Sequence, residues 1–146
     1  MKLVLDASIT LSWLLADGKP SDRQYARAAL DALSQDHNSA VVPTIWPYEI
    51  TNVLAKAETR GQLSEAQSEA FLELLAELSI DLDNGSPDKV PTSILQLARR
   101  YKLCSYDASY LELAMRMSLP LATLDADLQK AAKKAGVAKF SQEKPS

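Results

Sequence analysis

Short apolar runs alternate along the chain with longer stretches in which apolar residues recur at helical spacing. Each short run predicts a buried strand, and each longer stretch predicts an amphipathic helix. The strands are expected over residues 2–5, 40–42, 80–82, 119–123 and 137–140. The helices are expected over residues 7–16, 21–34, 44–60, 64–78, 88–102, 106–117 and 125–135. Short strands that alternate with helices are typical of an α/β fold built on a parallel sheet.

Local signals mark the ends of several of these helices. Ser64 and Gln67 have the S-x-x-Q spacing of a capping box, and Ser21 with Gln24 repeats that spacing earlier in the chain. Gly61 follows the predicted helix over 44–60 and is a suitable residue to end it.

The composition is that of one globular domain. The chain has 146 residues, of which 47% are hydrophobic and 24% charged, so a sizeable core can form without disulfides. We expect residues 1–140 to form a single domain and residues 141–146 to be a flexible tail. The single cysteine excludes an internal disulfide, and the single histidine excludes chemistry that needs a histidine pair. The apolar runs are far shorter than the ~20 residues that span a bilayer, and we expect a cytoplasmic protein.

Carboxylates follow two of the predicted strands. Asp6 comes directly after the first strand, and Asp125 and Asp127 come after the strand over 119–123. Because the carboxyl ends of parallel strands meet at one edge of a sheet, two separate segments deliver acids to the same rim. Asp6 and Asp125 also precede predicted helices, where an aspartate commonly serves as a cap, and that role remains an alternative.

Two further acids lie within predicted helices. The helical neighbours of Glu49 are mostly apolar, apart from Asn52 one turn later. Such a carboxylate is costly to bury unless it is paired, so the alternative role for Glu49 is a buried ion pair with Lys or Arg. Asp107 shares a helical face with Tyr110, and its alternative role is a cap near the start of its helix.

Acids from four chain segments would repel one another if they converged without a counter-charge. A hard divalent cation with oxygen ligands is the usual remedy. Such an ion can activate water for attack on a phosphodiester, and this chemistry requires neither histidine nor cysteine.

The order and spacing of four sequence blocks resemble the PIN-domain ribonucleases, specifically the VapC-like toxins of toxin–antitoxin pairs. The resemblance covers nearly the whole chain and runs through residues 3–8, 42–54, 105–114 and 119–128. The acidic quartet of that family falls on Asp6, Glu49, Asp107 and Asp125, with Asp127 as an auxiliary acid. The polar residues that accompany the quartet fall on Ser8, Asn52 and Thr123.

The resemblance implies a three-layer fold with a central parallel sheet of about five strands between helices. It also implies a Mg²⁺- or Mn²⁺-dependent endoribonuclease that forms a homodimer and is neutralised by a cognate antitoxin. The net charge of −3 is unfavourable for RNA, yet residues 99–146 hold 9 Lys and Arg against 5 Asp and Glu. Candidate RNA-binding residues are Arg99, Arg100, Lys102 and Arg116, and further cations are Lys130, Lys133 and Lys134.

Other functions share some of these features. A phospho-acceptor signalling domain is also an α/β fold with acids at strand ends, but it calls for a lysine at a late strand end, where this chain has Thr123 to Asp127. A non-catalytic binding module would use the rim only as a scaffold and would bind no metal. A metal nuclease that cuts DNA is a third alternative, since no residue pattern here reports on the 2′-hydroxyl. Tyr106 and Tyr110 either stack on bases or pack in the core.

Overall fold

A parallel sheet lies at the centre of the computed structural model, which describes residues 1–15, 17–85, 88 and 90–142. Within this part of the chain the strands are β1 (Lys2–Leu5), β2 (Ser39–Val42), β3 (Ile80–Leu82) and β4 (Leu121–Ala122). Their order is β3-β2-β1-β4, and all three pairings are parallel. The helices are α1 (Ala7–Ser12), α2 (Pro20–Leu33), α3 (Trp46–Thr59), α4 (Glu65–Glu77), α5 (Val90–Tyr101), α6 (Ser105–Met117) and α7 (Ala126–Lys134).

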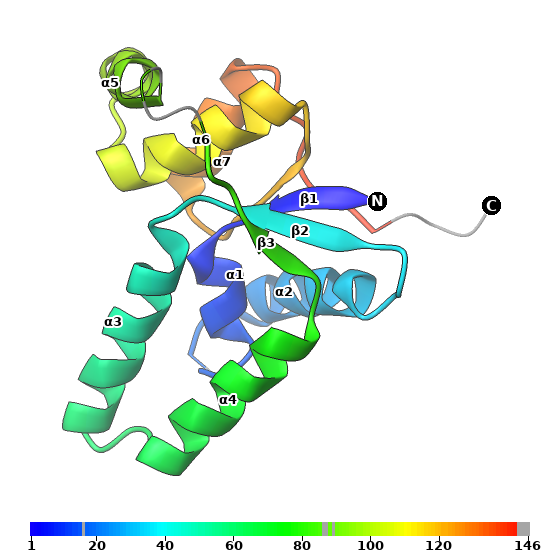
Figure 1. Ribbon diagram of the computed structural model, residues 1–146, viewed down its shortest axis with the longest axis vertical. Helices are drawn as coiled ribbons and strands as arrows, with labels where there is room; N and C mark the ends of the chain where they lie inside the picture. The colour runs from blue at the N-terminus through cyan, green and yellow to red at the C-terminus, as the bar shows by residue number, and fades with distance from the viewer. Residues whose placement is uncertain (16, 86–87, 89, 143–146) are drawn as a thin grey trace.

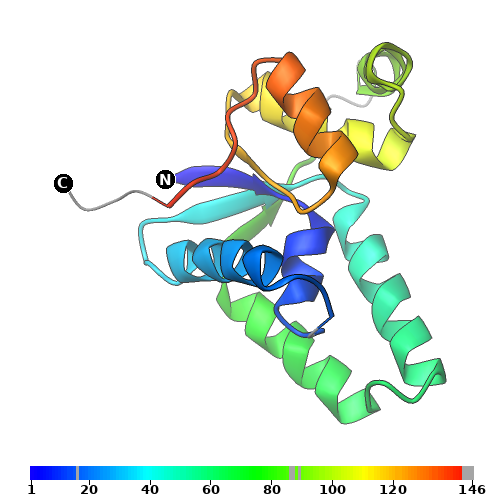
Figure 2. The same ribbon diagram turned by 180° about the vertical axis from the view of Figure 1, so that it is seen from behind.

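The helices cover both faces of the sheet, so the predicted three-layer α/β fold is confirmed. Helices α5, α6 and α7 lie on one side, and α1 to α4 lie on the other (Figure 1; Figure 2 from behind). Alternate strand residues serve the two layers, as the pleat requires. Val4 and Val41 belong to the core under α6 and α7, whereas Leu3, Leu5 and Val42 belong to the core against α2.

Helices α3 and α4 extend well beyond the sheet and approach each other at the turn that joins them (Figure 1). Ile50 and Leu54 of α3 pack with Phe71 and Leu75 of α4 in a third apolar cluster, which also includes Ala7 of α1. This cluster fixes α3 beside α1, and α3 is the helix that carries Glu49.

The prediction of five strands is wrong by one. Residues 137–140 pair with the sheet only through an isolated parallel bridge between Leu121 and Lys139. Because β4 is two residues long, the last segment finds a partner only at Leu121, which accepts a hydrogen bond from the Phe140 N–H at 2.9 Å. The hydroxyl of Tyr25 donates to the Phe140 carbonyl at 2.8 Å and fixes the segment from the α2 side.

One of the two predicted capping boxes is confirmed. The Ser64 hydroxyl accepts from the Gln67 N–H at 3.1 Å, and the Gln67 side chain accepts from the Ser64 N–H at 2.9 Å. The capping box at Ser21 and Gln24 is wrong, because α2 begins at Pro20 without a side-chain cap. Proline already has the φ of a helix and lacks the N–H that a cap would satisfy.

Two other expectations concern the ends of the domain and of the first helix. That helix ends at Ser12 instead of residue 16, and the Trp13 indole N–H donates across to the Ala26 carbonyl at 2.8 Å. Of the predicted tail, residues 143–146 lie outside the described residues, as do residues 86 and 87, where the sequence Asn-Gly-Ser-Pro over 84–87 predicts a turn. None of the helices in the described ranges is long and apolar enough to cross a membrane.

Candidate active site

Asp6 stands at the point where the two strands β1 and β4 end side by side. Its backbone N–H donates to the Ala122 carbonyl at 3.0 Å, which continues the pairing of the two strands. The Asp6 side chain is 5% exposed and makes no capping hydrogen bond to α1, so the alternative role as a cap is wrong. Its Oδ2 atom instead accepts from the Ser8 hydroxyl at 2.6 Å and the Thr123 hydroxyl at 2.7 Å.

Both hydroxyls are themselves held by the segment after β4. The Ser8 oxygen accepts from the Leu124 N–H and the Thr123 oxygen accepts from the Asp125 N–H, each at 3.0 Å. Since a hydroxyl has a single hydrogen, these acceptor bonds leave that hydrogen free to point at Asp6. The network therefore fixes the direction of the Asp6 carboxylate and ties the end of β1 to the start of α7.

Glu49 lies in the first turn of α3, and its partner comes from α6. The Tyr110 hydroxyl donates to Glu49 Oε1 at 2.6 Å. In the described part of the chain no Lys or Arg pairs with Glu49, so the buried ion pair considered from the sequence is wrong. Tyr110 is fully buried and cannot stack on a base, whereas Tyr106 is 56% exposed.

The role of Tyr110 as a donor to Glu49 was missed from the sequence. Its spacing of three residues from Asp107 did place it on the face that carries an acid.

Three aspartates surround the rim from α6 and α7. Asp107 lies in the first turn of α6, where Cys104 and not Asp107 caps the helix, with the Asp107 N–H 3.5 Å from the Cys104 sulfur. Asp125 does cap α7, since its Oδ1 atom accepts from the Leu128 N–H at 2.8 Å. Asp127 is exposed in the first turn of α7. Asp125 keeps its second carboxylate oxygen for another partner, because the capping bond uses only Oδ1.

Burial and mutual repulsion raise the pKa values of three of these acids. Burial is the larger cause for Asp6, and its two hydroxyl donors oppose the rise, while the nearby Asp125 charge adds to it. Burial also raises the pKa of Glu49, and the charges of Asp6 and Asp107 raise it further. For Asp107 the causes that raise the pKa are burial, then the charges of Asp125 and Asp6, with Asp127 last. The five acids thus share one electrostatic environment although they come from four segments.

The oxygen chemistry of this rim suits a hard divalent cation. Among the described residues, no three His, Cys, Asp or Glu side chains already form a group that could hold a metal ion. Like charges keep apart when no cation offsets them, and here their repulsion adds to the larger effect of burial in raising the pKa values of Asp6, Glu49 and Asp107. The carboxylate oxygens at the rim are therefore the type of ligand that Mg²⁺ or Mn²⁺ prefers, although among the described residues they are not grouped closely enough to hold an ion.

The structure places the other predicted site residues at the surface. Asn52 is exposed on α3 and takes part in no side-chain hydrogen bond of the described residues. Arg99 and Arg100 are exposed in the last turn of α5, and Lys102 is exposed just beyond it.

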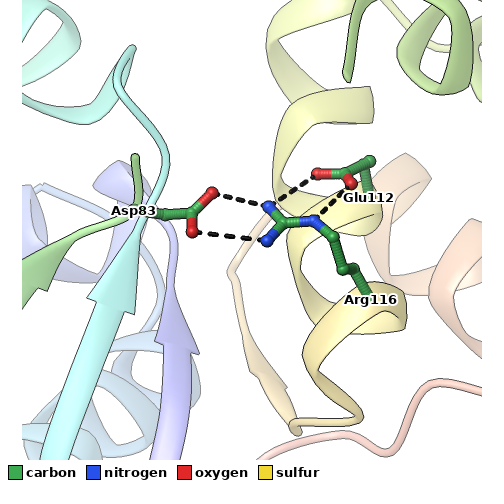
Figure 3. A network of polar contacts seen from close by, with 3 residues as sticks. All are labelled: Asp83, Glu112 and Arg116. Atoms are coloured by element: carbon green, nitrogen blue, oxygen red, sulfur yellow. Dashed lines mark hydrogen bonds and ion pairs between the residues drawn. The ribbon is translucent and has the colours of Figure 1, made fainter. Parts of the chain in front are cut away.

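Arg116 is already engaged within the molecule. Its guanidinium contacts Glu112 on α6 with Nε at 2.7 Å and Asp83 after β3 with Nη2 at 2.5 Å (Figure 3). These two carboxylates compete with any RNA phosphate for Arg116, so its predicted role in RNA binding stays a prediction that this geometry disfavours.

Comparison with known proteins assigns this chain to one family. A model of the PIN domain family matches residues 3–134, and the chain therefore belongs to that family. A relative is Ribonuclease VapC3 of Pyrobaculum aerophilum, which is 32% identical over 129 residues that cover 88% of this chain and 92% of the relative.

Solved structures share the same architecture. One is PAE2754 from Pyrobaculum aerophilum, with a TM-score of 0.67, 21% identity and coverage of 95% of this chain and 92% of that chain. Another is a toxin–antitoxin complex from Klebsiella pneumoniae, with a TM-score of 0.56, 22% identity and coverage of 84% and 86%. At these identities the likeness is one of fold.

Proposed function

We propose that this chain is the toxin of a toxin–antitoxin pair and acts as a metal-dependent endoribonuclease. Membership of the PIN domain family and the identity of 32% to Ribonuclease VapC3 support this class of reaction. The observation that carries the proposal is the gathering of Asp6, Glu49, Asp107 and Asp125 at one rim, where burial and the neighbouring charges raise the pKa values of Asp6, Glu49 and Asp107. Such a cost in stability is typical of a functional site.

The residues divide the work between holding an ion and orienting its ligands. Asp6, Glu49 and Asp107 would hold Mg²⁺ or Mn²⁺, and Asp125 would complete the oxygen set through its Oδ2 atom, with Asp127 as an auxiliary acid beside them. A divalent ion bound there would lower the pKa of a water molecule and offset negative charge at the scissile phosphate.

The neighbouring polar side chains act on these ligands and not on the substrate. Ser8 and Thr123 hold one oxygen of Asp6 in place, and Tyr110 holds one oxygen of Glu49. Such contacts fix the direction from which each carboxylate approaches an ion.

The geometry favours hydrolysis over the phospho-acceptor alternative. A phospho-acceptor aspartate needs an accessible oxygen and a nearby lysine, but Asp6 is 5% exposed. The side chain that follows β4 is Thr123, whose hydroxyl is committed to Asp6. A buried carboxylate with fixed donors is better suited to hold an ion than to accept a phosphoryl group.

An antitoxin would bind on the opposite side of the sheet from α7. A groove of about 600 Å³ lies between the end of α1, α2 and α4, with Trp13, Leu14, Phe71 and Leu74 among its lining residues. Leu74 is 61% exposed there, a large apolar area for a surface residue. The apolar face of an amphipathic helix would cover it, and we propose a cytoplasmic homodimer as the form that binds this partner.

The proposal is tested by incubating purified, antitoxin-free protein with a mixed pool of cellular RNA and, in parallel, DNA of matched length. Discrete RNA fragments are expected with Mg²⁺ or Mn²⁺ and none with EDTA. Asp6→Asn should abolish them, whereas Asp36→Asn, which removes the same charge from an exposed loop, should not. Intact RNA in both metals would contradict the proposal if circular dichroism showed the fold to be native and calorimetry showed no metal binding.

A further inference from the structure

A basic cleft of about 590 Å³ lies between the C-terminal end of α5 and the helix α7. It is lined by Arg100, Tyr101, Lys102, Asp127, Lys130, Ala131 and Lys134. Four of these seven side chains are cationic and only one is acidic. In a chain with a net charge of −3, this concentration of positive charge in one concave surface attracts anions.

Within the part of the chain that the structure describes, the cations of the basic cleft form no ion pair. The three ion pairs formed within the described residues use Arg27 and Arg116 and none of the cleft cations. Lys102, Lys130 and Lys134 are exposed, and the Arg100 guanidinium lies 5.6 Å from the centre of the Tyr101 ring. Arginine stacked on an aromatic ring keeps its outer N–H groups for a ligand.

The basic cleft leads away from the candidate active site. Asp127 lines its near end and lies close enough to Asp107 to raise the pKa of that acid. Lys130 and Lys134 follow Asp127 at helical spacing on one side of α7. At a rise of ~1.5 Å per residue they lie about 4.5 and about 10.5 Å further along the helix axis. An anionic chain that starts at the acids and their ion would therefore meet a row of lysines as it leaves.

The opposite wall depends on an unusual backbone at Lys102. Its φ of 55° lies in the left-handed region, and the Leu103 N–H donates to the Ala98 carbonyl at 3.1 Å to close the end of α5. Glycine is the common residue in this position of a helix end. The chain has a lysine there instead, and the turn presents it to the cleft.

We propose that the basic cleft binds the phosphodiester backbone of single-stranded RNA beside the scissile phosphate, an inference that rests on the proposed function. Cations on two facing walls suit one strand, and the Arg100 guanidinium that lies over the Tyr101 ring is a planar cation on which a base can stack. Asp127 stands at the end near the acids, where a divalent ion would offset its repulsion of phosphate.

The test is the salt dependence of RNA binding, measured by fluorescence anisotropy with the full-length chain. A mixed-sequence single-stranded RNA is used in EDTA, so that no cleavage occurs. The double variant Lys130→Gln and Lys134→Gln is compared with Arg23→Gln and Lys56→Gln, which remove the same charge from exposed positions on α2 and α3. Each phosphate contact to a single strand contributes about 0.7 to the slope of log K against log salt. The cleft variant should lower the magnitude of that slope by about 1.4. Its RNA affinity should therefore fall behind that of the wild type by about 25-fold for each tenfold decrease in salt concentration, while the control should match the wild type.

A second variant separates binding from folding. Lys102→Gly relieves the left-handed backbone and should raise the melting temperature, while it lowers RNA affinity. An unchanged RNA affinity in Lys102→Gly and in the double lysine variant would overturn the inference. Equal losses in the α2 and α3 control would do so too, because they would point to net charge alone. A cleft variant that keeps RNA affinity but loses antitoxin affinity would assign the cleft to an acidic protein segment and equally overturn it. Since binding is read without metal, failure of RNA cleavage by the wild type bears on the proposed function and not on this result.

Discussion

The hydrogen bond from Tyr110 to Glu49 provides a direct test of how the site is held. Tyr110→Phe removes one oxygen atom and leaves the ring in its fully buried place on α6. The change deletes the donor that fixes Glu49 Oε1 at 2.6 Å and leaves every acid of the rim in the chain. If Glu49 holds a cation, its freedom to rotate away should weaken that ion's binding.

The expected magnitudes follow from the partners. A hydrogen bond to a charged group contributes about 1.5–3 kcal/mol, and because water can reach the partly exposed Glu49, the lower end applies. At ~2–4 °C per kcal/mol for a chain of this length, the metal-free melting temperature should fall by about 3–6 °C. Loss of a group that orients a metal ligand typically costs about 10–100-fold in metal affinity.

The assay pairs calorimetric titration of Mg²⁺ and Mn²⁺ with thermal unfolding, and its control is Tyr25→Phe. The Tyr25 hydroxyl, on α2 and so on the face of the sheet opposite α6, donates to the neutral backbone carbonyl of Phe140 at 2.8 Å. That variant should lose about 1 kcal/mol of stability and keep its metal affinity. Metal affinity within about twofold of the wild type in Tyr110→Phe would refute the reasoning, as would an equal loss in Tyr25→Phe.

Three shorter predictions concern stability, pH and partner binding. Arg116→Met leaves Glu112 buried without its cation and should lower the free energy of unfolding by about 1–3 kcal/mol. Arg27→Met removes one partner of an exposed pair and should lower it by under ~0.5 kcal/mol. Urea unfolding measures both. Folding raises the pKa values of three site carboxyls. These carboxyls therefore contribute most to stability below their pKa values in the unfolded chain, near ~4. That contribution is lost as the pH rises through their higher pKa values in the folded protein. In EDTA the melting temperature should fall between pH 4 and pH 8, and it should fall less in Asp107→Asn. Addition of Mg²⁺ should reverse the fall. A melting temperature that does not change with pH would contradict this reasoning. Leu74→Arg should weaken antitoxin binding in a pull-down while RNA cleavage persists, and unchanged capture would remove the groove from the antitoxin surface.

The rim of the sheet was predictable because strand direction places it. Asp6 and Asp125 follow strands that alternate with helices, and parallel strands end at the same edge. The hydrogen bond between Tyr110 and Glu49 was not predictable in the same way, because 61 residues separate the two partners. It depends on how α3 and α6 meet across the sheet, and no local pattern contains that information.

The errors at the edge of the sheet have a related cause. The apolar pattern over residues 137–140 marks burial, and Phe140 is buried, but pairing also needs a neighbour of sufficient length. With β4 limited to Leu121 and Ala122, burial was predicted correctly and strand formation was not. Arg116 shows the same limit for charge, because the sequence reports a cation near an acid-bearing helix and not its existing partners, Asp83 after β3 and Glu112 on α6.

The acids of the rim differ in how firmly they are held, and this difference bears on how an ion would be bound. Asp6 has two hydroxyl donors on one oxygen, and Asp125 uses one oxygen to cap α7. Among the described residues, Asp107 has only the nearby Cys104 sulfur to oppose the repulsion of the other acids. A cation would thus meet fixed ligands from β1 and α7 and a less constrained one from α6. The hydroxyl network fixes the segments that carry Asp6 and Asp125, so an ion would gather its ligands by rotation of the carboxylate side chains. The repulsion that lowers the stability of the metal-free protein would then favour binding of the ion.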